Sequence, residues 1–290
     1  MATPIATEYS TDTILGMINQ YQAMMGSNVN YNYYPNTTLN TKYGVYVPKS
    51  VNGVWENVPP AGTVPSIAYF GVGIRGFYNI TSDDEISPLS QPYAPKATEM
   101  DLYRPIPIRC VPKAYDLTAA ERAKYRMRTE ITMDDGNVYV CYWLKKIEFE
   151  SSLNVNVING NGESSAYEFT EASVDLTPTP VAPTTPSVIA GSTKVVVSAN
   201  IKCEITGAEI LEAINVIYHG DLRRARISEW GIYTGVDNNA AQTPGGETYT
   251  EAMYVQLAAK RCTTGVDLSN SSSEQHEILT IQNGNLLLLD

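Results

Sequence analysis

Residues 194–233 constrain the fold of this chain more than any other stretch, because three consecutive pieces carry three clear periodicities. Residues 194–205 alternate apolar and polar side chains, which is the period of a half-buried strand. Residues 207–225 place apolar side chains at helical spacing, and residues 227–233 alternate again. The apolar positions are Val195, Val197, Ala199, Ile201, Cys203 and Ile205 in the first piece and Ile210, Leu211, Ile214 and Ile217 in the second. The stretch predicts a strand, a helix lying on the sheet and a second strand, and it indicates scaffold without chemistry.

Length and charge limit the classes of protein to consider. At 290 residues the chain is long enough for two ordinary domains or one large β-rich domain with insertions. A net charge of −11 makes it a poor non-specific binder of nucleic acid, because such binding depends on neutralising phosphates. Its 20 Tyr against 4 Phe favour surfaces that are buried at one end and wet at the other, as in interfaces. We find no long apolar run and no signal-peptide pattern, so we expect a protein made in the cytoplasm with no membrane partner.

Residues 1–26 are expected to form an N-terminal helical arm. A short polar segment precedes a helix that Ser10 or Thr11 is predicted to cap and that continues to Met25. One interpretation is a terminal helix packed on its own chain. The other is a helix that docks on a neighbouring subunit. The apolar stripe that either interpretation uses consists of Ile14, Leu15, Ile18, Tyr21, Met24 and Met25, and we take Ile14, Ile18 and Tyr21 as candidate interface residues.

Residues 27–176 are predicted to form a β-rich domain. The segment 71–76 is a literal Gly-x-Gly-x-x-Gly after a strand candidate, but the following residues break any helix, so close approach of strands is the better explanation and no cofactor is expected. A β-hairpin is predicted with strands at 127–133 and 138–149 and a turn at 134–137.

Residues 96–128 hold eight of the 20 basic residues of the chain. Prolines 105, 107 and 112 force an extended path, suited to a sheet edge or a partner surface. Asp116 is expected to cap a short helix after it. The basic residues form either a solvated face or a contact with an acidic neighbour, including another copy of the chain, and packaged nucleic acid is a third, weaker option. The candidate interface residues here are Arg104, Arg109, Lys113, Arg122, Lys124, Arg126 and Arg128.

A Pro- and Thr-rich segment, residues 177–193, is predicted to be a linker, so that residues 194–290 form a separate α+β assembly domain. Within that domain we expect a flexible tip at 237–252 and a terminal hairpin that turns at 283–284. The predicted fold class is mainly β, with sandwich- or barrel-like sheets, a few short helices, and α+β elements in the C-terminal half.

No residue pattern points to catalysis or to a metal. The four cysteines each stand alone in apolar or strand-like sequence, which favours buried free thiols, and the two histidines lack metal-ligand spacing. Paired carboxylates at 83–85 and at 134–135 fall in loop or turn sequence. We therefore expect a protein that is not an enzyme and that holds no cofactor and no metal ion. The cysteines and histidines are Cys110, Cys141, Cys203, Cys262, His219 and His276.

One strand carries a family resemblance. The run Ile227-Ser228-Glu229-Trp230-Gly231-Ile232-Tyr233 resembles the Ile-x-Glu-x-Gly-Leu-Tyr strand of bacteriophage tail-fibre and other tail-associated proteins, and it departs from the commonest residues at Trp230 and Ile232. The matching positions are Ile227, Glu229, Gly231 and Tyr233. Their physical content is a Glu that bonds to neighbouring backbone, a Gly for close strand approach and an aromatic ring for the core. With its flanks, the resemblance covers about 40 residues of the 290.

The resemblance implies a structural subunit of a tailed-phage virion, made in the host cytoplasm. We expect a symmetric ring in the neck or collar, the head–tail connector region, with copies of itself and with portal, tail or fibre proteins as partners. An alternative is a baseplate or tail-fibre attachment protein. An alternative of another class is a carbohydrate-binding or glycan-cleaving β-domain, which predicts an exposed Trp or Tyr in a groove beside a carboxylate pair. The three tryptophans, Trp55, Trp143 and Trp230, adjoin strand-like sequence that predicts their burial.

Overall fold

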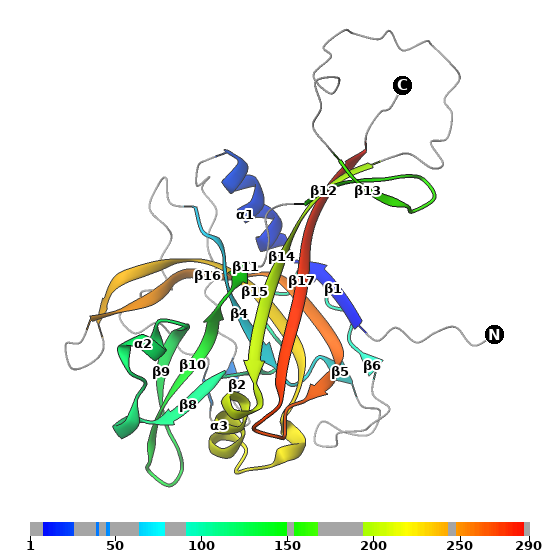
Figure 1. The fold of residues 1–290 in the computed structure, drawn as a ribbon. Helices are drawn as coiled ribbons and strands as arrows, with labels where there is room; N and C mark the ends of the chain where they lie inside the picture. Colours follow the sequence, from blue (N-terminus) through cyan, green and yellow to red (C-terminus); the bar gives the residue numbers. More distant parts are fainter. Residues whose placement is uncertain are drawn as a thin grey trace, which may run out of the picture. The chain divides into compact units, whose positions relative to one another are not determined.

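The computed structural model describes residues 8–25, 39–40, 45–46, 64–78, 91–149, 154–167, 194–242 and 248–286. These residues are mainly β-strand in antiparallel sheets with a few short helices, which confirms the predicted fold class (Figure 1). The helices are α1 (Ile14–Met25), α2 (Ala119–Arg122), α3 (Gly207–Ile217) and the 3-10 turns η3 (Lys113–Tyr115) and η5 (Leu222–Arg224).

The chain divides into two compact units. Unit 1 comprises Met1–Ile147 and Glu204–Gln275, and unit 2 comprises Glu148–Cys203 and His276–Asp290. This division differs from the expected boundary at residues 177–193, a segment that lies outside the described residues. The reason is strand pairing, because β14 (Lys194–Thr206) pairs with strands from both sides of that segment.

Unit 1 is built on one antiparallel sheet of eight strands. Its order is β1-β16-β15-β4-β10-β8, with β7 added to β4 and β9 added to β10. The strands are β1 (Glu8–Asp12), β4 (Ser66–Gly73), β7 (Pro105–Ile106), β8 (Arg109–Pro112), β9 (Tyr125–Thr132), β10 (Val138–Lys146), β15 (Arg226–Gln242) and β16 (Thr248–Asp267). Two short pairs accompany it, formed by β2 (Leu39–Asn40) with β3 (Val45–Tyr46) and by β5 (Phe77–Tyr78) with β6 (Gln91–Pro92).

The eight-stranded sheet curves so that the start of β16 approaches β9. The long strands β15 and β16 curve along their length, and their pairing is interrupted by register shifts, which bend and twist a sheet (Figure 1). At the N-terminal end of β16, both carboxylate oxygens of Glu251 accept hydrogen bonds from β9, from the backbone N–H groups of Met127 and Arg128. A side chain of β16 thus links this strand to β9.

Three expectations for residues 66–149 are confirmed. The hairpin forms as β9 and β10, and Gly136 in its turn has a φ of 81°. The Pro-rich segment is extended and supplies β8, at the end of the strand path. At the Gly-x-Gly-x-x-Gly segment no helix opens, and a Cβ added to Gly76 would lie 1.8 Å from the carbonyl oxygen of Ser228, so the glycine permits close backbone approach.

The N-terminus differs from the expected arm. Residues 8–12 form β1, paired with β16, instead of a polar lead into the helix. The helix begins at Ile14 because Thr13, and neither Ser10 nor Thr11, accepts the hydrogen bond of a helical N–H, that of Gly16 at 3.0 Å. The Thr13 hydroxyl also donates to the backbone of β16, which fixes the start of α1 on that strand.

The short helix after the Pro-rich segment also begins at another cap. Thr118 caps α2 in a capping box with Glu121. Asp116 instead accepts hydrogen bonds from Tyr142 and Arg128, so its predicted capping role is wrong.

The strand–helix–strand prediction for residues 194–233 is confirmed as β14, α3 and β15. The flexible tip expected at 237–252 is mostly strand, because β15 continues to Gln242 and β16 begins at Thr248. The terminal hairpin is also wrong: β17 (Glu274–Leu286) is one strand that runs through residues 283–284.

Unit 2 contains residues of an antiparallel sheet of five strands. Its order is β11-β14-β12-β13, with β17 also paired to β14. The strands not yet described are β11 (Glu148–Phe149), β12 (Asn154–Ile158) and β13 (Ser164–Ala166). Most of β14 and β17 belongs to this unit, and the end of β14 and the start of β17 belong to unit 1.

Candidate functional site

The strand that carries the family resemblance is central to unit 1, and its glutamate holds irregular backbone in place. The side chain of Glu229 is fully buried. It accepts hydrogen bonds from the backbone N–H groups of Arg75 at 2.7 Å, Tyr103 at 2.5 Å and Arg104 at 3.0 Å. Two segments without regular structure are thereby fixed to β15. The expected role of this Glu, bonding to neighbouring backbone, is confirmed.

A buried lysine completes this arrangement. The ammonium group of Lys260, on β16, lies 3.5 Å from the Glu229 carboxylate and 3.0 Å from that of Glu99. It also lies 3.1 Å from the ring centroid of Tyr103 and donates to the carbonyl oxygen of Asp101. The positive charge of Lys260 and the negative charges of Glu99 and Glu229 compensate one another for their burial, so we take this group as structural.

The remaining motif positions are packing positions. Ile227 and Tyr233 are buried. A Cβ added to Gly231 would lie 2.8 Å from the ring of Tyr233 and 2.9 Å from Leu257, so a side chain there would have to displace these two. The ring of Trp230 lies 6.2 Å, centroid to centroid, from that of Phe70.

Two basic residues of the stretch 96–128 are almost completely buried and find their acidic partners within the chain. Arg126, on β9, makes a bidentate contact with Asp237, on β15, at 2.8 and 3.0 Å. Tyr69 and Lys146 donate to the same carboxylate. Burial alone would raise the pKa of Asp237, but the donors from Arg126, Tyr69 and Lys146 outweigh it and lower that pKa.

The second buried guanidinium, Arg128, is held in the same way. It contacts Asp116 at 2.8 and 3.0 Å and Glu130 at 3.4 Å. Lys113, which is exposed, lies 2.7 Å from the other oxygen of Glu130. Burial opposes ionisation of Asp116, and the hydrogen bonds from Tyr142 and Arg128 reverse the effect and lower the pKa of this carboxyl.

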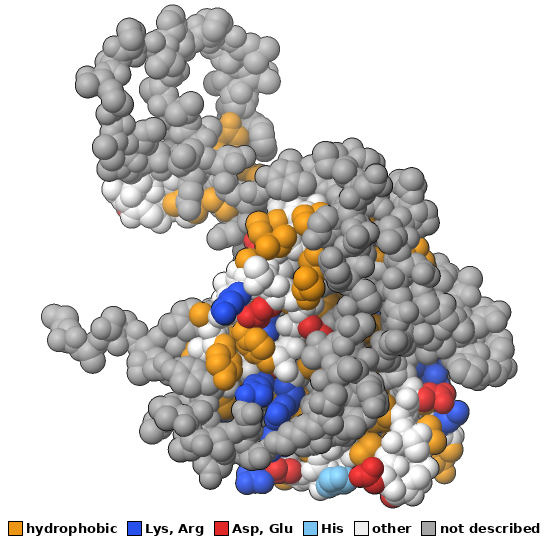
Figure 2. Space-filling view, turned by 180° about the vertical axis from the view of Figure 1, so that it is seen from behind, with side chains coloured by type: hydrophobic (Ala, Val, Ile, Leu, Met, Phe, Trp, Pro, Cys, Tyr) orange, Lys and Arg blue, Asp and Glu red, His pale blue; other side chains and the backbone are white. Residues whose placement is uncertain are grey.

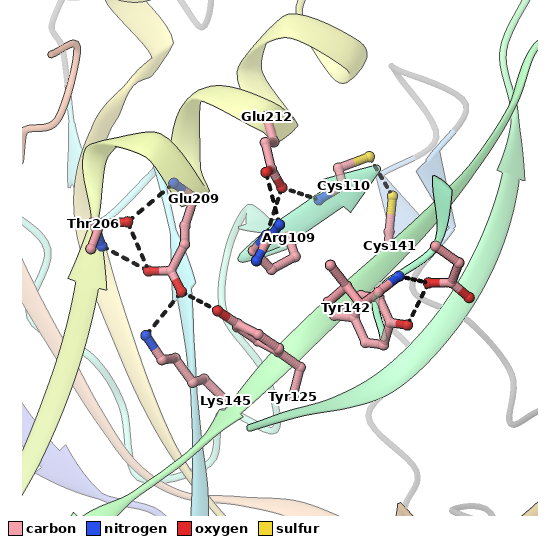
Figure 3. Close-up of polar contacts among 11 residues, drawn as sticks. Arg109, Cys110, Tyr125, Cys141, Tyr142, Lys145, Thr206, Glu209 and Glu212 are labelled. Atoms are coloured by element: carbon pink, nitrogen blue, oxygen red, sulfur yellow. Dashed lines mark hydrogen bonds and ion pairs between the residues drawn. The ribbon is translucent and has the colours of Figure 1, made fainter. Parts of the chain in front are cut away.

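Arg109 attaches helix α3 to the edge strand β8. Its guanidinium contacts Glu212 at 2.7 and 3.0 Å, and the same carboxylate accepts the backbone N–H of Cys110 at 3.3 Å (Figure 3). Through Glu212, the helix is thereby fixed to β8, the last strand in the order of the sheet.

The N-terminal end of α3 is fixed by a second carboxylate. Thr206 and Glu209 form a capping box in which each side chain accepts the backbone N–H of the other. Tyr125 donates to Glu209, and the ammonium group of Lys145 lies 2.9 Å from it (Figure 3). Helix α3 is therefore anchored both at its capping residue and in its middle, through the half-buried Glu212.

The other basic candidates are distributed differently. Arg104 is buried, Arg122 is half-buried and Lys124 is exposed. On the face drawn in Figure 2, described basic and acidic side chains lie near one another. The structure thus places the acidic partners of Arg109, Lys113, Arg126 and Arg128 within the same chain, where sequence reasoning looked for a neighbouring subunit. Sequence reasoning missed these partners: Asp116 and Glu130 lie in or next to the basic stretch, and Glu212 and Asp237 come from distant segments.

The apolar stripe of α1 is divided between two environments. Leu15 and Asn19 are buried against the sheet, and Asn19 donates to Thr234 at 2.8 Å. Of the candidate interface residues, Ile14 is 41% exposed and Ile18 is half-buried. Tyr21 lies in α1, but its side chain is outside what the structure describes. The helix uses one narrow face for its own chain and leaves part of its apolar stripe accessible.

Unit 2 contains an apolar face that was not predicted. The register of β12 and β14 pairs Val155 with Val197 and Val157 with Val195, so all four side chains lie on one face of the sheet. Val197 is 39% exposed and the other three are half-buried. We call these four residues the valine face. The sequence signal for this face was the alternation of apolar and polar residues in two segments, 153–158 and 194–198. How these two segments pair with each other could not be read from the sequence.

The predictions about metal ions, tryptophans and cysteines can be compared with the described residues. Among these residues, no group of three or more His, Cys, Asp or Glu side chains is placed to hold a metal ion. A small apolar cavity lined by residues such as Met127, Trp143 and Tyr233 has room for about one water molecule. Trp143 and Trp230 are buried, as predicted, and Trp55 lies outside the described residues. The four cysteines are buried free thiols, as predicted.

Comparisons with known proteins give one match. A family described as a family of unknown function (DUF7208) matches residues 1–285. No curated protein and no solved structure matches the chain. In the part of the chain that the structure describes, the helices are too short or too polar to cross a membrane.

Proposed function

The chain belongs to DUF7208, a family of unknown function, and from that premise we propose that it is a structural subunit of a tailed-bacteriophage virion. In this proposal, copies of the chain join into a symmetric ring in the neck or collar, the head–tail connector region. The partners are copies of itself and other virion proteins, and the protein is made in the host cytoplasm before it enters the particle.

The observation that carries the proposal is the valine face of unit 2. Four valines lie together on one face of a sheet, and the chain buries none of them completely. A shared apolar surface of this kind is typical of contact with another protein. Its proposed occupant is a second copy of the chain, because a ring is made by repeating one contact between identical subunits.

The buried ion pairs of unit 1 support a structural role in preference to catalysis. The carboxylates of Glu229, Asp237 and Glu212 are each occupied by two or more donors from the chain itself. Such groups fix loops and a helix to the sheet. A rigid scaffold of this kind suits a subunit that must present the same surface in every copy.

A baseplate or tail-fibre attachment protein is the second candidate. It is favoured by the resemblance of the strand around Glu229 to tail-associated proteins, since that strand has the structural role its residues predict. The carbohydrate-binding alternative gains no support from the two described tryptophans, which are buried.

The native mass of the purified chain, measured by light scattering over a range of concentration, tests the proposal. We expect assembly into a closed ring, with six or twelve copies favouring the neck and three copies favouring the fibre or baseplate. Val197→Asp places a charge on the valine face and should shift the mass towards the monomer at every concentration.

Ser164→Asp is the matched control. It adds the same charge to an exposed position of the same sheet, and its register partner Ile158 lies on the opposite face from Val157. This variant should assemble as the unchanged chain does. Equal masses for all three proteins would refute the valine face as the assembly surface.

A further inference from the structure

Two of the buried cysteines are directly opposite each other on neighbouring antiparallel strands. Cys110 on β8 is the register partner of Cys141 on β10, and their sulfur atoms are 2.7 Å apart (Figure 3). Both side chains are almost completely buried. Two sulfur atoms without a bond between them normally pack at a greater separation, so the strand pairing holds these two in unusually close contact.

The backbone geometry suits a covalent bond between them. The N–H of Cys110 points to Glu212 and not to β10, which marks this position as a non-hydrogen-bonded pair in the ladder. In such pairs the Cα atoms are about 4.5 Å apart, inside the range of about 4.4–6.8 Å found in disulfides. The sulfur atoms need to approach by less than about 1 Å to reach the disulfide bond length of about 2.05 Å.

We propose that Cys110 and Cys141 are an oxidisable pair that closes to a cross-strand disulfide when the protein meets a low-molecular-weight disulfide such as oxidised glutathione. The thiolate of one cysteine attacks a sulfur of the oxidant, forms a mixed disulfide and releases one glutathione thiolate. The thiolate of the other cysteine then attacks the protein sulfur of that mixed disulfide and releases the second glutathione thiolate. The two cysteine protons end on two molecules of reduced glutathione, so the protein loses two electrons and the oxidant gains two.

Position and environment decide the rate of this reaction. Burial raises the pKa of Cys141 well above the ordinary value, and the neighbouring Cys110 adds to the effect, so little thiolate is present in the closed sheet. Reaction therefore requires the edge strand β8 to open locally. Once closed, the disulfide links β8, which carries α3 through the Arg109–Glu212 ion pair, to the hairpin strand β10. This inference does not depend on the proposed function.

The test is a redox titration of the folded, full-length chain in glutathione buffers, followed by acid quenching, alkylation under denaturing conditions and peptide mass mapping. The chain has four cysteines, and we expect two to become protected together as the buffer becomes oxidising. The mapping should show a peptide pair joined through Cys110 and Cys141. The melting temperature should rise by about 5–10 °C on oxidation, because the bond closes a loop of intermediate length.

Two variants make the result specific. The double variant Cys203→Ala, Cys262→Ala keeps the pair and should show the same titration. Cys110→Ala should remove both the protection and the rise in melting temperature. If Cys110→Ala fails to fold, the peptide mapping of the unchanged chain still decides the matter. The proposal would be overturned if all four cysteines were alkylated after the quench at every point of the titration. A linkage that involves Cys203 or Cys262 would also overturn it.

Discussion

At the scale of single residues, the molecule is organised by carboxylates that each collect several donors from distant segments. Asp237 is the clearest case, because Arg126, Tyr69 and Lys146 come from three different strands and meet at its two oxygens. Arg126 has a side chain that is only 3% exposed. Removing the negative charge of Asp237 would leave that buried guanidinium without its carboxylate partner, with backbone carbonyl oxygens as its remaining acceptors.

We therefore expect Asp237→Asn to lower the free energy of unfolding at pH 7 by about 3 kcal/mol, the cost of breaking a buried pair. The folded-state pKa of Asp237 is below the unfolded value, so its contribution is present above the unfolded value and is lost as the pH falls through the folded one. The difference between the two proteins should therefore narrow as the pH falls below about 4. Urea unfolding at neutral and acidic pH measures both quantities.

Asp221→Asn supplies the control for this experiment. Asp221 contacts Arg223 at 2.8 Å and, more distantly, Arg224 at 3.7 Å, and the side chain of the nearer arginine is 77% exposed. Water can replace the lost partner there, so this variant should unfold at nearly the same urea concentration as the unchanged chain. A loss as large as that of Asp237→Asn would show that burial of the ion pair is not what matters.

At the scale of elements, Glu251 connects the start of β16 with the edge of β9 and has the opposite dependence on pH. Burial raises its pKa to about 7, although three backbone N–H groups lower it. A raised folded-state pKa means that its contribution is fully present below the unfolded value of about 4.5 and is lost as the pH rises through about 7.

Replacing the carboxyl group of Glu251 by an amide should remove its contribution to the pH dependence of stability. We expect the stability of Glu251→Gln, relative to the unchanged chain, to increase by up to about 3 kcal/mol between about pH 4.5 and pH 8. Parallel urea unfolding of the two proteins at several pH values measures the difference. A difference that stays constant over this range would contradict the titration of Glu251 in the folded state.

Local patterns in the sequence predicted the elements well. The strand–helix–strand unit, the β9–β10 hairpin and the extended Pro-rich segment all have local signals: periodicity, turn residues and prolines. The errors fall where tertiary contacts decide. Residues 274–286 form one strand that pairs with β14, and residues 8–12 pair with β16 although most of them are polar.

The candidate site was harder to predict than the fold. The role of Glu229 could be expected from its strand, but the donors that it binds come from residues about 125 to 154 positions away. The basic stretch 96–128 was visible as a cluster in the sequence, yet its pairing was not: Asp116 lies inside the stretch and Glu130 just after it, whereas Glu212 and Asp237 are distant. Pairing between distant segments is set by the register of the sheet, which no local pattern encodes.

At the scale of the whole molecule, the charges and the apolar surface have separate tasks. Many basic residues are used inside unit 1 to hold its loops and helix, and the chain keeps a net charge of −11. Two copies that approach each other therefore repel overall, while the valine face supplies apolar contact. Salt screens the repulsion between copies and leaves the apolar attraction.

The sign of the salt dependence of assembly follows from this separation. If assembly uses the valine face, raising the salt concentration from about 0.05 to about 0.5 M should strengthen it, because the Debye length falls well below the size of the contact. Light scattering at a fixed protein concentration measures the change, and Val197→Asp should show little assembly at either salt concentration. Assembly that weakens as salt is added would instead indicate attraction between opposite charges. In that case the exposed residues of the basic stretch, such as Lys113 and Lys124, would again be the candidates for contact with the adjacent subunit.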